Sequence, residues 1–430
     1  MANVLLVNSS VADPLLLYRQ KRMAPPLGLA YLCAAMKKEG ISVAAIDMNI
    51  PFLNFGDLER MIEKECPRII GISVYTETFA NGLKIANTAK GIDSKIITVM
   101  GGPHVTFVPN EVLRHSEVDI VVRGEGENTM LELTRHFLDG FGSLNDIRGI
   151  TYREHSDIIT TPDRPFINDL DTLPLPDRSL FPLALYRDPG TISTGRGCPY
   201  RCIFCAAGPV SGYKYRMRSP DNIVAEIAQL QKEYGIKFFS FVDDTFTAFP
   251  DHTLRILDLL QELDYKVRWQ CTTRVNMVTR EMLKRMSETG CTAITLGIES
   301  GSQKILDSIR KKISVSQSKD TVKWALESGI KPFCSFTIPH PQDTEETVLE
   351  TRDLMIEFAK EGADVSISFT VPYPGTYLYE HSRELGMIPL FDKWEDFLTT
   401  HPNFFTKHLS LGKINSLVAD TITALENLRR

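Results

Sequence analysis

The sequence predicts an α/β protein in which two regions of alternating strands and helices follow one another. Short β-branched runs alternate with segments of helical period over most of the 430 residues. A proline-rich stretch interrupts this alternation before the middle of the chain. Strands separated by helices indicate parallel pairing, because a parallel strand needs a crossover connection. At about 150 residues per domain, the length suggests two or three domains.

The first region contains five strand–helix units between residues 3 and 140. Five units predict an open, doubly wound sheet, either Rossmann-like or flavodoxin-like, and the number of strands favours the latter. The predicted strands are Val4–Val7, Val43–Asp47, Arg68–Val74, Lys95–Met100 and Asp119–Val122. The predicted helices are Leu27–Lys38, Leu58–Cys66, Ala80–Ala89, Glu111–His115 and Thr129–Leu138.

A hairpin and a linker are predicted next. Residues Ile147–Thr161 alternate in polarity, and six prolines break any regular period between Pro162 and Pro189. We therefore expect a first domain over residues 1–145, and a hairpin with a proline-rich linker over 146–189.

The second region holds six further strand–helix units, too few for an eight-fold barrel. They predict a partial (βα)6 barrel over 190–390, with a C-terminal extension over 391–430. One of its helices is marked by Ser219 as a cap and Pro220 in the first turn. The predicted strands are Thr191–Thr194, Phe238–Val242, Val267–Thr272, Ala293–Ile298, Pro332–Ile338 and Val365–Val371.

Composition excludes several classes of function. Lys and Arg number 48, Asp and Glu number 54, and the net charge is −6. No basic excess is available to neutralise phosphates, which argues against nucleic-acid binding. No run approaches the roughly 20 apolar residues that span a bilayer. The N-terminus lacks the basic start and cleavage site of a signal peptide, so we expect a cytoplasmic protein.

The placement of the eight cysteines carries the strongest chemical signal. Cys33, Cys66, Cys271, Cys291 and Cys334 stand singly, as buried structural cysteines often do. The other three, Cys198, Cys202 and Cys205, follow a predicted strand with C-x3-C-x2-C spacing. Three thiolates on one loop can hold three irons of a 4Fe–4S cubane and leave the fourth iron open. Zinc is the alternative, but no fourth Cys or His lies near this trio in the sequence.

The cysteine loop resembles the signature of the radical S-adenosylmethionine superfamily. The resemblance implies that S-adenosylmethionine binds the open iron and is cleaved reductively to a 5′-deoxyadenosyl radical. It also implies a low-potential electron donor of the ferredoxin or flavodoxin type. Residues at the predicted strand ends then become candidate cofactor contacts. These are Phe204 in the loop, Asp243 and Asp244 for the methionyl amino group, Arg274 for its carboxylate, Glu299 and Ser300 for the ribose, and Tyr373 near the adenine. An N-cap is the structural alternative for either Asp.

The first domain resembles the cobalamin-binding domain of class B radical methyltransferases. The resemblance rests on Pro25–Leu32, the pair Gly101–Gly102 and the linker around Leu173–Pro174. No G-x-G-x-x-G follows the first strand, so a dinucleotide site is not supported. In an open α/β sheet the ligand lies outside the carboxyl ends of the strands. The candidate contacts there are Asn8, Ser9, Ser73, Tyr75, Thr76, Gly101, Gly102, His104, Gly124, Glu125 and Gly126.

The motif D-x-H-x-x-G, whose histidine ligates cobalt from below, is absent from the sequence. We therefore expect the loop after the third strand to pass beneath the corrin, with Tyr75 nearest the cobalt as a candidate catalytic residue. His104 is expected to contact the nucleotide tail. Two alternatives remain: Tyr75 packs on a helix and water takes its place, or the domain is a docking module without cobalamin.

Together these resemblances imply a cobalamin-dependent radical C-methyltransferase that acts on an unactivated carbon. A cyclase acting on a tetrapyrrole or other small molecule is the main alternative. A methylthiotransferase would need three more cluster cysteines in the first domain, which has only Cys33 and Cys66. A non-catalytic cobalamin carrier or redox sensor is the third. The substrate is a protein, a peptide or a small molecule. The compact chain resembles enzymes that methylate a glutamine of methyl-coenzyme M reductase in methanogens.

Overall fold

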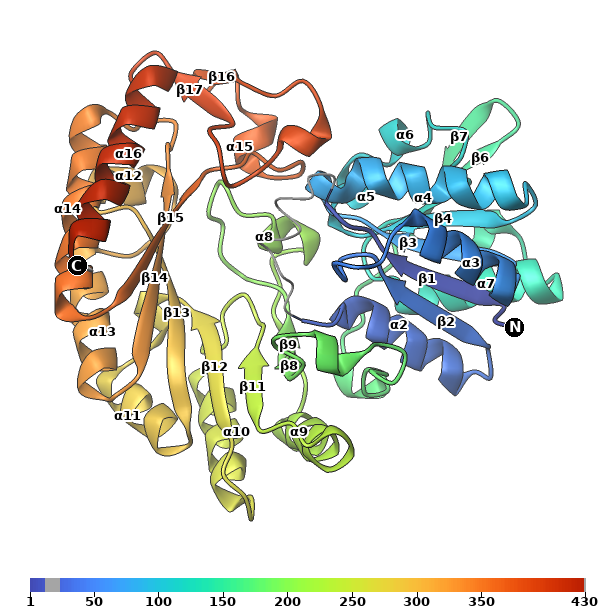
Figure 1. Cartoon of the computed structure of the whole chain (residues 1–430), viewed down its shortest axis with the longest axis horizontal. Coiled ribbons are helices and arrows are strands. Elements are labelled where there is room, and N and C mark those ends of the chain that lie inside the picture. Colours follow the sequence, from blue (N-terminus) through green and yellow to red (C-terminus); the bar gives the residue numbers. More distant parts are fainter. Residues whose placement is uncertain (12–23, 429–430) are drawn as a thin grey trace. The chain divides into compact units, whose positions relative to one another are not determined.

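The computed structural model describes residues 1–11 and 24–428, which form two compact units, Met1–Pro189 and Gly190–Arg430 (Figure 1). The first unit contains a seven-stranded sheet of order β2-β1-β3-β4-β5-β6-β7. Its five parallel strands are β1 Val4–Asn8, β2 Val43–Asp47, β3 Ile69–Ser73, β4 Ile97–Gly101 and β5 Ile120–Val122. The order 2-1-3-4-5 is the flavodoxin-like one, with its switch point between β1 and β3.

Helices cover both faces of this sheet, because its central strands are mostly apolar and buried. On one face α2 packs against α7, and on the other α3 packs against α4 (Figure 1). Two short helices follow β4 where the sequence predicts a single one. The helices are α2 Leu27–Lys38, α3 Phe55–Glu65, α4 Phe79–Ile92, α5 Pro103–Phe107, α6 Pro109–Val112 and α7 Glu127–Asp139.

The hairpin is part of the first sheet. Its strands β6 (Ile150–Glu154) and β7 (Asp157–Thr160) add antiparallel to β5. The proline-rich segment also packs on the first unit, because Phe181 and Tyr186 enter the same apolar core. The Tyr186 hydroxyl donates to the buried Asp47 at 2.9 Å. The stretch from Pro162 to Pro189 therefore packs on the first unit without regular secondary structure over most of its length, and the first unit ends at Pro189.

The second unit is built on six parallel strands whose spatial order equals their chain order, as a partial barrel requires (Figure 1). The strands are β8 Thr191–Ile192, β11 Phe238–Phe241, β12 Arg268–Thr273, β13 Cys291–Glu299, β14 Lys331–Ile338 and β15 Asp364–Phe369. The helices are α8 Ala207–Val210, α9 Pro220–Tyr234, α10 Pro250–Glu262, α11 Arg280–Glu288, α12 Gln303–Ser308, α13 Val315–Glu327, α14 Glu345–Glu361, α15 Tyr377–Glu380 and α16 Leu411–Leu428.

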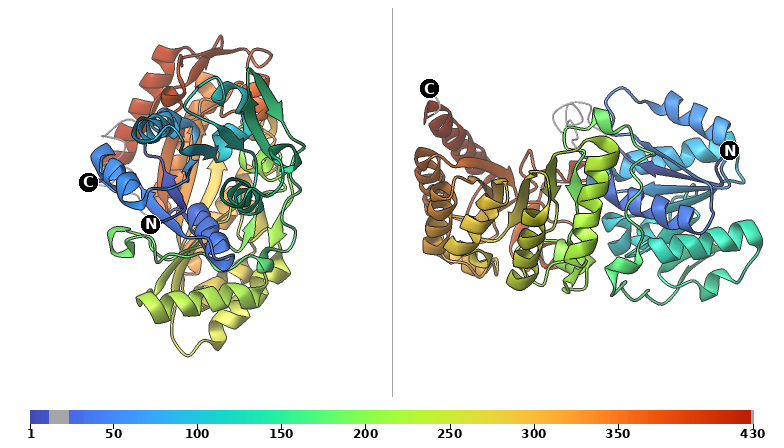
Figure 2. Two further views of the ribbon diagram at one scale, coloured as in Figure 1. Left: turned by 90° about the vertical axis from the view of Figure 1, so that its right-hand side faces the viewer. Right: turned by 90° about the horizontal axis from the view of Figure 1, so that it is seen from below.

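Two local features explain how this unit is assembled. Ser219 caps α9 as the sequence predicts, since its hydroxyl accepts from the N–H of Asn222 at 3.2 Å. The C-terminal residues include α16, which packs on α14 of the same unit (Figures 1 and 2). In this contact α16 buries Leu417 and Val418. They follow a small antiparallel pair, β16 (Met387–Pro389) and β17 (Phe404–Thr406).

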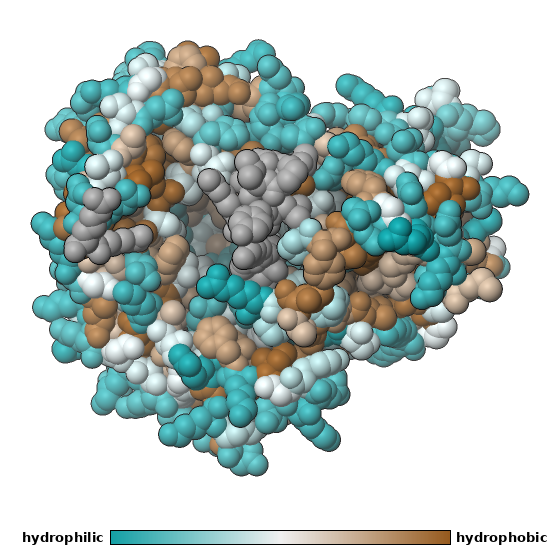
Figure 3. Space-filling view, viewed as in Figure 1, coloured by the Kyte–Doolittle hydropathy of each residue, from teal (hydrophilic) through white to brown (hydrophobic). Residues whose placement is uncertain are grey.

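Polar residues dominate the visible surface of the second unit. On the face that Figure 3 shows, hydrophilic residues cover most of the outer rim of the second unit, and apolar residues form small patches between them. No helix within residues 1–11 and 24–428 is long and apolar enough to cross a membrane.

Candidate functional site

The three clustered cysteines lie on the loop between β9 (Gly195–Arg196) and α8, at the carboxyl end of β8. Cys198 and Cys202 are buried, and Cys205 is half-buried. Burial raises the pKa of the Cys205 thiol to about 12, and the charges of its two neighbours add to the increase. Three soft thiols on one short loop suit three irons of a cubane cluster.

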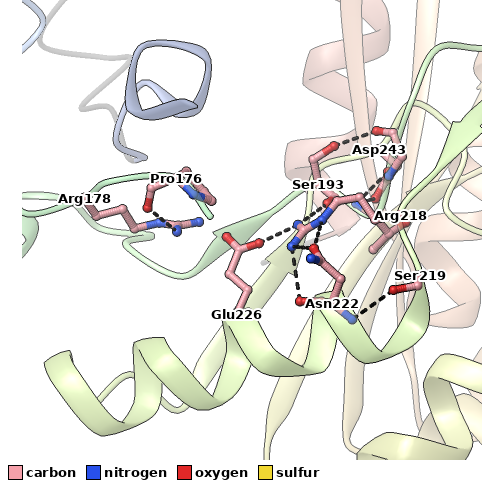
Figure 4. Close-up of polar contacts among 10 residues, drawn as sticks. Pro176, Arg178, Ser193, Arg218, Ser219, Asn222, Glu226 and Asp243 are labelled. Atoms are coloured by element: carbon pink, nitrogen blue, oxygen red, sulfur yellow. Dashed lines mark hydrogen bonds and ion pairs between the residues drawn. The ribbon is translucent and has the colours of Figure 1, made fainter. Parts of the chain in front are cut away.

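A clamp fixes the backbone that leads into this loop (Figure 4). On one side, the buried Asp243 carboxylate accepts from the backbone N–H groups of Thr194 at 3.0 Å and Gly195 at 2.7 Å. On the other side, the Arg218 guanidinium donates to the Ser193 carbonyl at 2.8 Å. Residues 193–195 are thus held by two charged side chains from different elements.

Arg218 and Asp243, the two charged residues of the clamp, each contact a further side chain. Arg218 forms a fully buried ion pair with Glu226 of α9 (Figure 4). The Tyr215 hydroxyl donates to Asp243 at 3.3 Å. Burial raises the pKa of Asp243 to about 6, although the backbone donors act in the opposite direction. These contacts give Asp243 a structural role, and its predicted contact with a cofactor stays a prediction.

Asp244 differs from its neighbour, because its side chain is exposed and no hydrogen bond to its carboxylate is found within the described residues. Its charge raises the pKa of both Cys198 and Cys205, after the larger effect of burial. The hydroxyl of the next residue, Thr245, lies 4.0 Å from the Cys198 sulfur, so Asp244 lies near the cysteine loop, and partial burial raises its own pKa. Of the two predicted acids, Asp244 is the one available to a ligand.

Arg274, at the end of β12, turns toward the cysteine loop. Its guanidinium donates to the Cys202 sulfur at 3.3 Å and to the carbonyl of Lys311. It also stacks on the Tyr200 ring, 3.9 Å from the centroid. An N–H group aimed at a cluster sulfur is one of the contacts that tune a cluster's reduction potential. In this structure the predicted partner of a methionyl carboxylate is a neighbour of the thiols.

Glu299 ends β13 at a register shift and in a left-handed backbone conformation, with φ of 70°. Its carboxylate accepts from the Lys311 ammonium at 2.7 Å and from the Thr337 hydroxyl at 3.3 Å. Ser300 faces another way, since its hydroxyl lies 3.0 Å from that of Thr351. The predicted ribose segment thus places one buried carboxylate at the barrel end, and Ser300 ties the loop to α14.

Two buried polar atoms lie at the next strand ends without a hydrogen-bond partner within the described residues: Nδ1 of His340 after β14 and Oγ1 of Thr370 after β15. The His340 ring lies 5.7 Å from that of Phe204, the aromatic residue of the cysteine loop. Tyr373 follows β15 in the turn that Thr376 closes by donating to its carbonyl at 2.6 Å. Unpaired buried polar atoms are rare in native proteins. A polar group bound at this end of the barrel could supply the missing partners.

Sequence reasoning misses Arg218, Tyr215, Lys311 and His340. Each acts through a contact between elements far apart in the chain. A lysine twelve residues after a strand-end glutamate is a weak pattern in a sequence with 48 basic residues. Only the fold brings them to the cysteine loop.

In the first unit, several predicted contacts are used internally. The Asn8 amide donates to Asp47 at 2.8 Å. The Ser9 hydroxyl lies 2.7 Å from that of Thr78 and donates at 2.8 Å to the carbonyl of Ser73. These bonds join the ends of β1, β2 and β3. They stiffen the edge of the sheet at its switch point.

The loop after β3 contains one exposed and one buried candidate. The Tyr75 side chain is 53% exposed, whereas Thr76 is buried. The Thr76 hydroxyl lies 3.2 Å from Nδ1 of His104, whose ring is 2% exposed and packs on Phe79 at 4.7 Å. Burial lowers the pKa of His104 to about 4, so the ring is neutral at pH 7. Tyr75 is thus accessible at the switch point, and His104 lies within the core.

The predicted glycines play different roles. A Cβ on Gly102, whose φ is 115°, would lie 2.3 Å from the Val74 carbonyl oxygen, so this glycine allows β4 to meet β3 closely. A Cβ on Gly126 would meet Leu32 at 3.3 Å, whereas Gly124 has open space around it and Gly101 only ordinary contact. Glu125 accepts from the N–H of Ile167 at 2.7 Å. Because Gly101 and Gly124 have no side chain, the backbone at the ends of β4 and β5 is open to close approach by a ligand.

Comparison with known proteins decides the family. Residues 192–355 match the Radical SAM superfamily, and residues 20–134 match the B12 binding domain. An uncharacterized methyltransferase of Pyrococcus horikoshii is 37% identical over 92% of this chain and 86% of its own length. The chain belongs to the cobalamin-dependent radical S-adenosylmethionine enzymes.

Two further comparisons support the fold and the breadth of the family. The anaerobic magnesium-protoporphyrin IX monomethyl ester cyclase of Cereibacter sphaeroides is 28% identical over 91% of this chain and 65% of its own length. The radical S-adenosylmethionine methyltransferase TsrM of Kitasatospora setae superposes with a TM-score of 0.78 at 17% identity, over all of this chain and 89% of its own. These findings confirm the predicted fold class and family.

Membership of this family implies a 4Fe–4S cluster, S-adenosylmethionine and cobalamin. The residues present fit these groups. The cysteine loop offers three thiols and no fourth, and the barrel end has the buried, unpartnered Nδ1 of His340. In the first unit, the bare backbone of Gly101 and Gly124 and the exposed Tyr75 suit a flat cofactor at the switch point.

Replacing Cys198, Cys202 or Cys205 with Ala should abolish the iron that the anaerobically reconstituted protein binds, because each thiolate would hold a separate iron of the cluster. Cys33, Cys271 and Cys334 are buried and lie far from the loop in sequence. Replacing any of them should leave iron content unchanged. Iron and sulfide analysis measures both sets. Loss of iron in the second set would show that a cluster ligand lies outside the loop.

Asp243→Ala should lower the unfolding free energy of the second unit by roughly 1–3 kcal/mol for each buried N–H left unpaired, and should reduce iron content. The matched control is Asp244→Ala, which removes an exposed side chain and should leave thermal melting unchanged. Melting curves and iron assays compare the two. Equal melting of both variants would contradict the clamp.

The cobalt should have no histidine ligand from this chain's predicted site, because the His104 ring is buried and packed on Phe79. Paramagnetic resonance of the cob(II)alamin-loaded protein should lack the threefold splitting that an axial nitrogen imposes, and His104→Gln should not change the spectrum. A triplet pattern that disappears in His104→Gln would overturn this assignment.

Proposed function

We propose that this enzyme is a C-methyltransferase that replaces a hydrogen on an unactivated carbon of its substrate with a methyl group. The observation that carries the proposal is the combination of the cysteine loop at a barrel end with a B12 binding domain in one chain. The methyltransferase from Pyrococcus horikoshii, which is similar over most of its length, supports the same reaction type.

The residues of this chain divide the work. Cys198, Cys202 and Cys205 would hold the cluster, and the Asp243–Arg218 clamp fixes the backbone that leads into their loop. Asp244 would accept from the amino group of S-adenosylmethionine, since its carboxylate is exposed beside the thiols. When bound, the cofactors supply the radical that removes a hydrogen atom and the methyl group that replaces it.

Burial around the barrel end protects this chemistry from water. Phe204, His340 and Glu299 come from three different segments, and the two polar side chains among them are buried. A reactive carbon radical needs such a dry site, because solvent and side reactions quench it. An external low-potential electron donor, of the ferredoxin or flavodoxin type, would reduce the cluster.

Ring formation on a tetrapyrrole is the second candidate function. It is supported by the similarity to the Cereibacter sphaeroides cyclase over 91% of this chain. The two reactions share hydrogen abstraction and differ in whether the product gains a methyl group. A protein substrate, such as a glutamine of methyl-coenzyme M reductase, is one substrate class that the experiment below includes.

The deciding experiment incubates the reconstituted, cobalamin-loaded protein with a reductant and S-adenosylmethionine that carries a deuterated methyl group. The substrates are a glutamine peptide from methyl-coenzyme M reductase and magnesium-protoporphyrin monomethyl ester. We expect a product that has gained the labelled methyl, with both 5′-deoxyadenosine and S-adenosylhomocysteine formed.

Cys202→Ala is the inactive control. A product that has lost hydrogen without gaining the label, with 5′-deoxyadenosine but no S-adenosylhomocysteine, would favour the cyclase. Absence of any 5′-deoxyadenosine from the wild-type protein would contradict both functions.

A further inference from the structure

The loop between α12 and α13, residues Ile309–Ile313, lies directly against the cysteine loop and the end of β12. The carbonyl of Ile309 accepts from the N–H of Ile203 at 3.1 Å. The carbonyl of Lys311 accepts from the Arg274 guanidinium. That of Lys312 accepts from Asn276 at 3.4 Å. A segment more than a hundred residues from the cysteines therefore supports them through its backbone.

This loop has an unusual backbone conformation. Arg310 and Lys312, which flank Lys311, have φ values of 56° and 54°. With Glu299 at 70°, three of the six non-glycine residues with positive φ in the described chain gather here. L-residues adopt this conformation at a cost, and it persists where surrounding contacts enforce it. The contacts that enforce it converge on Lys311.

Lys311 makes contacts with both its side-chain ammonium and its backbone carbonyl. Its ammonium lies 2.7 Å from Glu299 Oε1, and the two side chains are only 6% and 10% exposed. An ion pair at this distance gives each buried side chain an oppositely charged partner. Its carbonyl meanwhile holds Arg274, whose other nitrogen donates to the Cys202 sulfur at 3.3 Å. One residue thus links the carboxylate at the end of β13 to the cysteine loop.

We propose that Lys311 is a positioning residue for S-adenosylmethionine. Its ammonium fixes the Glu299 carboxylate at the barrel end, where that carboxylate accepts from the cofactor, and its carbonyl orients Arg274 at the cysteine loop. The Thr337 hydroxyl, 3.3 Å from the other Glu299 oxygen, completes the restraint. The proposal rests on the proposed function only in that S-adenosylmethionine binds at this end of the barrel.

The test compares the reconstituted wild-type protein with Lys311→Met and Lys312→Met. Lys312 is the matched control, because it is the next residue of the same loop and its side chain is exposed. S-adenosylmethionine is titrated into the reduced protein, and binding is followed by the change in the paramagnetic resonance signal of the cluster. This readout does not depend on methyl transfer.

Lys311→Met should retain its iron and bind S-adenosylmethionine roughly 10- to 150-fold more weakly, the range expected when a charge-assisted hydrogen bond is lost. Lys311→Arg, which can keep the ion pair, should recover most of the affinity, and Lys312→Met should bind like the wild type. Unchanged affinity in an iron-loaded Lys311→Met, or equal weakening in Lys312→Met, overturns the proposal.

A second comparison, with Glu299→Gln and the double variant, keeps the test valid if Lys311→Met alone folds poorly. Glu299→Gln should weaken binding as much as Lys311→Met does. The double variant, which leaves no unpaired charge, should bind within about twofold of Glu299→Gln, because residues that act through one another are not additive. Additive losses would show that Lys311 acts elsewhere. If the wild type itself bound no S-adenosylmethionine, the proposed function would fail, and this inference with it.

Discussion

The buried carboxylate of Asp243 is the contact that fixes the chain where it enters the cysteine loop of the second unit. A strand of only two residues, β8, precedes the cysteine loop, and so short a strand cannot fix the direction of the chain that leaves it. Asp243 and Arg218 supply what the strand lacks, by binding three consecutive backbone groups. Charged hydrogen bonds inside a protein are strong and directional, so they hold the loop within narrow limits.

The same device recurs around the site in different forms. Arg274 binds a carbonyl and a thiol, and Lys311 binds a carboxylate with its ammonium and a guanidinium with its carbonyl. Each charge is satisfied within the barrel end, which avoids the cost of a buried unpaired ion. The result is a continuous polar network from Cys202 to Thr337. The first unit shows a neutral version, in which Ser9 joins the ends of neighbouring strands.

The fold was open to prediction because it follows from local pattern. Every strand of both parallel sheets lies within a few residues of its predicted range, since β-branched runs and intervening helices mark them directly. The cysteine loop was also legible, because three thiols at that spacing have few other uses. The partners of the polar side chains were not. The sequence pattern does not show whether the Asp243 carboxylate faces a ligand or the backbone N–H of Gly195, a residue 48 positions away. The exposure of His104 likewise depends on its packing against Phe79.

The hairpin at the edge of the first sheet has a consequence for how the protein is handled by the cell. Strand β5 is wholly apolar and buried on both sides, and without β6 it would offer its free backbone groups to any other strand. The hairpin replaces that edge with β7, four residues whose ends are polar and exposed. Short, hydrophilic edges resist the addition of foreign strands. During synthesis, a nascent chain that has emerged only as far as β5 therefore exposes an unpaired, aggregation-prone strand edge. That edge becomes paired when residues 150–160 emerge from the ribosome.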